Sequence, residues 1–132
     1  DDMVAGVTPQ QFQANLDKIV GSLRAGGHTK VLVANVPPLQ QLPAFQACVG
    51  GFTPCPINNP PPEAQILAEA AAYNTAITQV AAAHGATVVD LWNGGAQLAG
   101  HPEYLAADGF HPSTQGAAVL AQTFYQDWQK SR

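Results

Sequence analysis

Two short apolar strands separated by a long helix constrain the fold of this chain most. Lys30–Val36 and Thr87–Leu91 are rich in β-branched residues and lack polar alternation, a pattern typical of strands buried on both faces of a parallel sheet. A helix predicted from Pro62 to about His84 lies between them and can return the second strand parallel to the first. The sequence therefore predicts an α/β fold with helices on both faces of a parallel sheet.

Two further helices flank these strands. The first has Thr8 as its N-cap and Pro9 in its first turn, and it ends before Gly26 and Gly27, which follows the usual residue preferences at helix ends. The last runs from Ser113, a plausible N-cap, to about Gln129. Its predicted buried side consists of apolar residues at helical spacing: Ala117, Leu120, Phe124 and Trp128.

The connections are long and irregular. Residues 37–62 hold eight of the eleven prolines and have no regular period, and such loops in compact domains are usually functional or cover a site. A short helical turn is predicted around Asn93–Ala99, followed by a loop over residues 100–112. In the helix from Pro62 to about His84 we expect Asn74 to satisfy a buried backbone group and His84 to be solvated at the helix C-terminus. At the end of the second strand we expect Asp90 to cap the turn that follows it.

The number of strands indicates that the fold is incomplete. A chain of 132 residues fits a single domain, but two strands give helices little surface to pack on and leave an exposed apolar edge. We therefore expect further strands from elsewhere, either an N-terminal segment or a second chain. On this view residues 1–132 are a single domain or the C-terminal part of one.

Composition limits the partners and the compartment. The net charge of −4 without a Lys/Arg patch argues against binding to nucleic acid or anionic membranes, and no apolar stretch is long enough for a membrane span. Few lysines and abundant Ala, Gln, Thr and Pro favour a secreted or extracytoplasmic protein, with a cytoplasmic one as the alternative. Cys48 and Cys55 have six residues between them, which suits a loop-closing disulfide better than a CxxC motif; two free thiols are the alternative.

The candidate chemistry is concentrated in one short stretch, Asp108-Gly109-Phe110-His111-Pro112. An Asp and a His three residues apart can meet across a tight turn, so that the carboxylate holds the imidazole Nδ1–H and leaves Nε2 as a general base. One alternative is a purely structural turn in which Asp108 is a cap and His111 is merely exposed. Another is a metal site formed by His101, Asp108 and His111, although these spacings match no standard ligand set.

This stretch resembles the last block of the GDSL/SGNH family of serine esterases and lipases, which carries the Asp and His of the catalytic triad. Other stretches also resemble family blocks, in the same order along the chain: Asp1–Gly6, Val31–Leu39, Ala72-Tyr73-Asn74, Gly85 and Val89-Asp90-Leu91. The resemblance implies a three-layer α/β/α, flavodoxin-like parallel sheet and a hydrolase without a cofactor. It assigns the roles of base and orienting carboxylate to His111 and Asp108.

The family nucleophile has no counterpart in this sequence. It lies in a Gly-Asp-Ser-Leu-like motif, and a Gly and an Asn elsewhere donate to the oxyanion; none of these blocks is present. The only serines are Ser22, Ser113 and Ser131, and Ser113 is explained by its N-cap role. The chain therefore resembles the C-terminal part of such a hydrolase, and we expect little or no esterase activity from it alone.

The resemblance also implies a cleft for an ester substrate, for which the sequence offers apolar candidates on two loops: Leu39, Leu42, Phe45 and Phe110. Two other classes of function remain open. One is a non-catalytic binding module that retains a degenerate hydrolase fold. The other is an oligomerising fragment whose exposed sheet edge pairs with a second copy.

Overall fold

The fold is known from a computed structural model, which describes residues 2–3, 5–49, 61–94 and 100–131. Its centre is a parallel sheet formed by β1 (Leu32–Ala34) and β2 (Thr87–Val89), in which Val33 pairs with Val88. The predicted strands are thus present and parallel, but paired over three residues each. A mixed, helix-rich α/β architecture follows from these elements.

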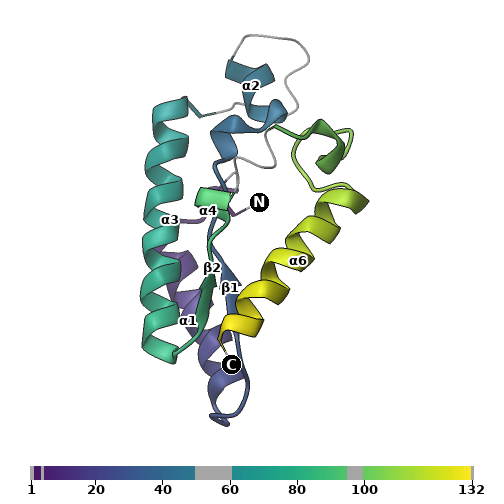
Figure 1. The fold of residues 1–132 in the computed structure, drawn as a ribbon. Helices are drawn as coiled ribbons and strands as arrows, with labels where there is room; N and C mark the ends of the chain where they lie inside the picture. The colour runs from purple at the N-terminus through teal and green to yellow at the C-terminus, as the bar shows by residue number, and fades with distance from the viewer. Residues whose placement is uncertain (1, 4, 50–60, 95–99, 132) are drawn as a thin grey trace.

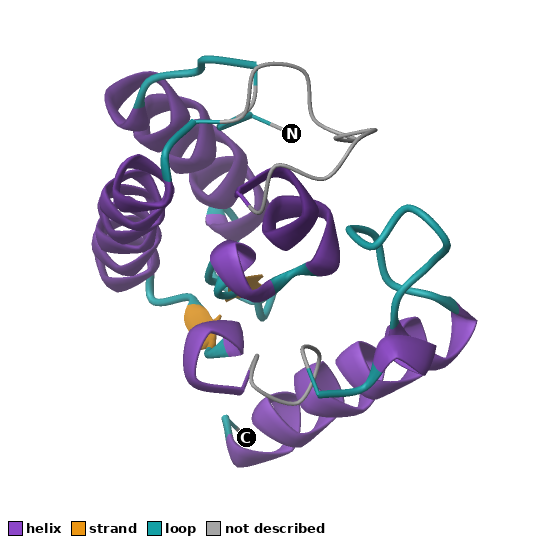
Figure 2. Cartoon of the chain, turned by 90° about the horizontal axis from the view of Figure 1, so that it is seen from above, coloured by secondary structure: helices purple, strands orange, loops and turns teal. Residues whose placement is uncertain are grey.

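Helices lie on both sides of the two strands (Figures 1 and 2). The helices α1 (Pro9–Arg24) and α3 (Glu63–His84) pack against each other on one side, and α6 (Thr114–Lys130) lies on the other. The caps explain where the helices begin and end. Thr8 forms a capping box with Gln11, Ser113 Oγ accepts from the Gly116 N–H, and Gly85 ends α3 in a left-handed conformation.

The loop predicted over residues 37–62 is more regular than expected in its described part. It contains a 3₁₀ turn, η1 (Leu39–Gln41), and the helix α2 (Pro43–Val49). The apolar residues that fix this segment are few and irregularly spaced, with Leu42 and Phe45 buried against Ile66 of α3. The prediction of an irregular loop was therefore wrong here, because the high frequency of proline obscured a short helix that is buried on one side.

The predicted turn at Asn93–Ala99 begins earlier than expected, as α4 (Leu91–Gly94); residues 95–99 lie outside the described part of the chain. Two polar side chains set this start. The Asn35 Oδ1 atom accepts from the N–H groups of Leu91 and Trp92, and Asp90 Oδ1 accepts from the Asn93 N–H. Asp90 therefore is the cap that the sequence indicated.

The core lies mainly between α3 and its neighbours. One cluster joins Val20, Val31 and Val80, and another joins Leu42, Phe45 and Ile66. Asn74 is used as predicted, because its side chain accepts from the Val36 N–H at 2.7 Å and donates to the Val36 carbonyl at 3.2 Å. This pairing attaches α3 to the chain just beyond β1.

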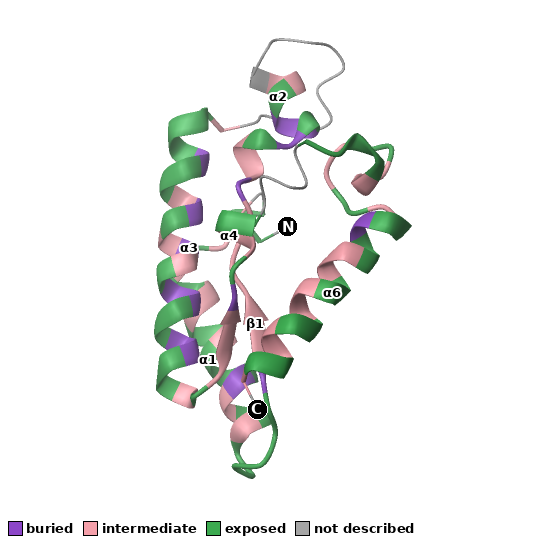
Figure 3. Ribbon diagram, viewed as in Figure 1, coloured by how far each residue is buried: buried purple, intermediate pink, exposed green. Residues whose placement is uncertain are grey.

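The sheet and α6 are less buried than predicted (Figure 3). All three residues of β1 are only half-buried, whereas the sequence predicted strands buried on both faces. The predicted buried side of α6 is also less buried than expected. Leu120, Phe124 and Trp128 are half-buried, and Ala117 is exposed. The reason is geometric, since a sheet of two short strands is too narrow to cover a helix of this length.

Candidate active site

The loop between η2 (Pro102–Tyr104) and α6 carries the predicted Asp–His pair and is closed by its own backbone. The Ser113 N–H donates to the Tyr104 carbonyl at 2.8 Å, and the Ala106 N–H donates to the His111 carbonyl at 2.8 Å. The Ser113 hydroxyl also donates to the Glu103 carbonyl. These bonds join the two ends of the loop where α6 begins.

Gly116 allows α6 to approach this loop closely. A Cβ atom at this position would lie 2.0 Å from the Tyr104 carbonyl oxygen, well inside any permitted contact. Gly116 is also the buried residue of α6. The loop is therefore held against the helix by a backbone contact that a larger residue would prevent.

Asp108 organises the turn and contacts the imidazole at the same time. Its Oδ1 atom accepts from the N–H groups of Phe110 at 2.9 Å and His111 at 3.0 Å. Its Oδ2 atom lies 2.7 Å from Nδ1 of His111. Gly109, between them, has φ +66°, which glycine adopts readily. The Asp–His contact expected from the spacing is thus present.

The charge of Asp108 is stabilised by these bonds. Hydrogen bonding to His111, followed by the N–H groups of Phe110 and His111, lowers the pKa of the Asp108 carboxyl from its ordinary 3.8 to about 2. A carboxyl whose pKa is lowered in the folded state stabilises that state above its ordinary pKa. This contribution is lost as the pH falls from about 4 toward about 2.

The orientation of His111 leaves its other nitrogen available. Its side chain is 60% exposed, and within the described residues no hydrogen bond involves Nε2. An imidazole held at Nδ1 by a carboxylate with Nε2 open has the arrangement of a general base. The metal alternative has no geometric support, because no group of three His, Cys, Asp or Glu side chains in the described residues could hold an ion.

A second pair lies just before this loop, at the start of η2, and was not predicted from the sequence. His101 Nδ1 lies 2.7 Å from Glu103 Oε1, and the imidazole stacks on Tyr104 with ring centroids 4.7 Å apart. A hydrogen bond from its own backbone N–H, followed by the bond with His101, lowers the pKa of the Glu103 carboxyl. The only sequence signal for this pair is an acidic residue two positions after a histidine, and that spacing is too common to predict a contact.

The four apolar candidates for the cleft do not lie in equivalent environments. Leu42 and Phe45 are buried, with 5% and 2% of their surface exposed. Leu39 and Phe110 are partly buried and pack against them. All four belong to one cluster at the Asp–His loop, and their contact with substrate stays a prediction. The predicted disulfide cannot be followed, since Cys55 lies outside the described residues.

A small pocket lies beyond the carboxyl ends of the two strands. It has a volume of about 320 Å³ and is lined by residues that follow the two strands, by α3 and by α4: Asn35, Ala71, Asn74, Asp90, Trp92 and Asn93. Hydrogen bonds from Asn35 and Asn93 lower the pKa of Asp90. The polar side chains here bond mainly to one another and to backbone, so we assign the pocket a structural role.

The comparison with known proteins decides the family. The model of the GDSL-like lipase/acylhydrolase family matches residues 1–119. This chain belongs to that family. The match covers the Asp–His loop and both strands of the GDSL chain, and it supports an esterase or acylhydrolase class of enzyme. No curated protein and no solved structure matches.

Among the described residues, no helix of this GDSL chain combines the length and apolarity needed to cross a membrane.

Proposed function

We propose that this chain supplies the general base, His111, and its orienting carboxylate, Asp108, to a serine ester hydrolase. The observation that carries the proposal is the 2.7 Å contact between Asp108 Oδ2 and His111 Nδ1. It is made by a carboxylate whose other oxygen already builds the turn, and it leaves Nε2 open. Membership of the GDSL family supplies the reaction class.

The proposed reaction is acyl transfer. Nε2 of His111 takes the proton of a serine hydroxyl, and the serine oxygen attacks the ester carbonyl carbon to form a tetrahedral intermediate. The imidazolium then gives that proton to the alkoxide as the carbon–oxygen bond breaks, which releases the alcohol and leaves an acyl-serine. Water, deprotonated by the same imidazole, hydrolyses the acyl-serine. Asp108 stabilises the imidazolium in both halves.

The nucleophile in this proposal comes from polypeptide outside the present sequence. The serines of the chain have other roles, because Ser113 Oγ bonds to Glu103 and Gly116, and Ser131 Oγ donates to the Trp128 carbonyl at 2.9 Å. Ser22 lies inside α1. The oxyanion donors would come from the same polypeptide, which completes the sheet as an N-terminal segment or a second chain.

The incomplete burial of β1 and α6 supports a missing segment that completes the sheet. The half-buried residues of β1 and the half-buried aromatic residues Phe124 and Trp128 of α6 face solvent in part. Further parallel strands that extend this sheet edge to edge would bury these residues and produce the three-layer α/β/α, flavodoxin-like sheet. Residues 1–132 would then be the C-terminal part of one domain. Secretion and a Cys48–Cys55 disulfide are further parts of the proposal, supported by composition and spacing.

Hydrolysis of p-nitrophenyl acetate tests the proposal. We expect buffer-level rates from this chain alone and enzyme-like rates after co-expression with the polypeptide encoded directly upstream of residue 1. A fluorophosphonate probe should label the upstream polypeptide and leave this chain unlabelled. In the complex, His111→Ala should remove the activity, while the matched variant His101→Ala should retain it.

Two results would overturn the proposal. Enzyme-like hydrolysis by this chain alone that is insensitive to His111→Ala would exclude the assigned base. A complex that forms but neither hydrolyses the ester nor reacts with the probe would favour the alternative of a non-catalytic binding module.

A further inference from the structure

The Asp–His loop contacts α2 through a close backbone approach. The Ala44 N–H, in the first turn of α2, donates to the Gly109 carbonyl at 3.2 Å. A Cβ on Gly109 would lie 3.1 Å from Pro43 Cβ and 3.2 Å from the Ala44 nitrogen. The turn that carries Asp108 and His111 is therefore seated directly on the N-terminus of α2.

A chain of aromatic contacts connects α2 to the imidazole of His111. The rings of Phe45 and Phe110 have centroids 6.0 Å apart, and the rings of Phe110 and His111 are perpendicular, at 89°, with centroids 4.9 Å apart. Phe45 is 2% exposed and anchored beside Leu42 and Ile66. Phe110 thus contacts both the buried ring of Phe45 and the imidazole of His111.

Burial indicates what Phe45 does in this arrangement. A residue that binds an acyl chain needs an accessible face, and Phe45 has almost none. In contrast, the side chains of Asp108 and His111 are 46% and 60% exposed, and an exposed ion pair gains little from its own contact. Something besides their mutual attraction is needed to hold the ring in one orientation.

We propose that Phe45 is a positioning residue that acts through Phe110 to hold the His111 ring with Nδ1 toward Asp108 and Nε2 outward. Its importance for catalysis rests on the proposed function above. The contact itself is a property of this chain, and it extends the site from the loop to α2.

The imidazole tautomer of His111 reports this orientation, because the hydrogen bond at one ring nitrogen decides where the proton resides. We propose to record ¹⁵N spectra of the full chain at about pH 9, above the ordinary imidazole pKa of about 6.5. The wild-type ring should be mainly the Nδ1–H tautomer. Exposed His28 serves as the internal reference, since no hydrogen bond of its ring is found in the described residues.

Phe45→Ala should shift the His111 tautomer ratio toward that of His28, and Phe45→Leu, which keeps an apolar side chain, should restore the wild-type ratio at least in large part. Phe12→Ala is the matched control. It also deletes a ring from an aromatic pair, with Tyr73 at 4.4 Å in the α1–α3 interface, and it should leave His111 unchanged.

Folding of each variant is checked by circular dichroism. If Phe45→Ala does not fold, Phe110→Leu provides the test, because it keeps an apolar side chain in the cluster and removes the ring that contacts the imidazole. A wild-type tautomer ratio in the folded variant would overturn the inference. Because the spectrum requires no nucleophile, failed ester hydrolysis by the complex would count against the proposed function and not against this positioning.

Discussion

Two His–Asp pairs in this molecule have the same length and different consequences. His84 Nε2 lies 2.7 Å from Asp17 Oδ1, and His111 Nδ1 lies 2.7 Å from Asp108 Oδ2. The first joins α3 to α1, between residues 67 positions apart; the second closes a turn between residues three positions apart. Distance alone therefore does not distinguish a structural pair from a candidate catalytic one.

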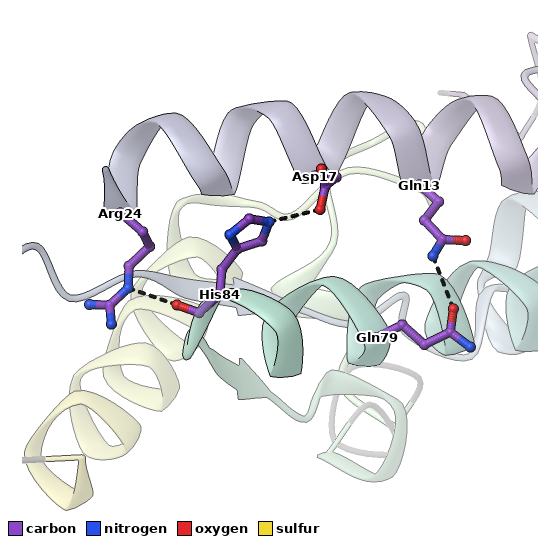
Figure 4. A network of polar contacts seen from close by, with 5 residues as sticks. All are labelled: Gln13, Asp17, Arg24, Gln79 and His84. Carbon is purple, nitrogen blue, oxygen red and sulfur yellow. Dashed lines mark hydrogen bonds and ion pairs between the residues drawn. The ribbon is translucent and has the colours of Figure 1, made fainter. Parts of the chain in front are cut away.

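The neighbours of each pair make the distinction. His84 belongs to a row of polar contacts between two helices, with Arg24 Nε donating to the His84 carbonyl and Gln13 bonding to Gln79 (Figure 4). Asp17 occupies Nε2, the outer nitrogen of the ring, and the His84 side chain is 26% exposed. His111 uses the inner nitrogen, and 60% of its side chain is exposed. The greater exposure of His111 makes it the better placed of the two imidazoles to take a proton from a substrate-side group.

The sharpest way to break this comparison is to neutralise each carboxylate in the reconstituted hydrolase. In Asp108→Asn the amide oxygen can still accept from the turn N–H groups, but its NH₂ then faces Nδ1 and favours the wrong tautomer. We expect kcat for p-nitrophenyl acetate to fall by about 10⁴-fold, the loss known for this change in a serine-protease triad. Asp17→Asn is the control and should change kcat little. Equal losses in the two variants would contradict the distinction.

The close approach of α6 to the loop gives the next largest effect. Gly116→Ala places a Cβ 2.0 Å from the Tyr104 carbonyl oxygen, so α6 or the loop has to shift. We expect the free energy of unfolding to fall by about 1–3 kcal/mol, the usual cost of overpacking. Denaturant titration measures it. Gly26→Ala is the control because nothing lies within 4 Å of its Cβ position. An equal effect of the two substitutions would show that the loop is not seated on Gly116.

The contrast between the two pairs also shows what could be predicted from the sequence. The Asp108–His111 contact depends on four consecutive residues, because an Asp accepts readily from the N–H groups two and three positions on. Local pattern is enough for such a turn. The same holds for the caps at Thr8, Asp90 and Ser113, which were confirmed.

Contacts between segments that are distant in the sequence could not be predicted from the sequence pattern. His84 was expected to be solvated, and that prediction was wrong because its partner is supplied by another helix at Asp17. Periodicity predicts that α1 and α3 are helices, yet it does not fix their relative rotation. The seat of the loop on α2 was missed for a related reason, since Phe45 and Phe110 come from segments without regular spacing. The sequence pattern therefore located the candidate base, His111, but not the residues of α2 that hold its loop in place.

The smallest expected effect concerns the energy of the interhelical pair. A double-mutant cycle with His84→Ala and Asp17→Ala, at about pH 5 where an ordinary imidazole is charged, should give a coupling energy of about 0.5 kcal/mol, as for exposed ion pairs. Denaturant unfolding of the four proteins measures it. The pair is too exposed for more, since the Asp17 side chain is 55% accessible. A coupling energy above about 2 kcal/mol would instead match a desolvated pair. The His84–Asp17 pair would then be a main contributor to the stability of the α1–α3 interface.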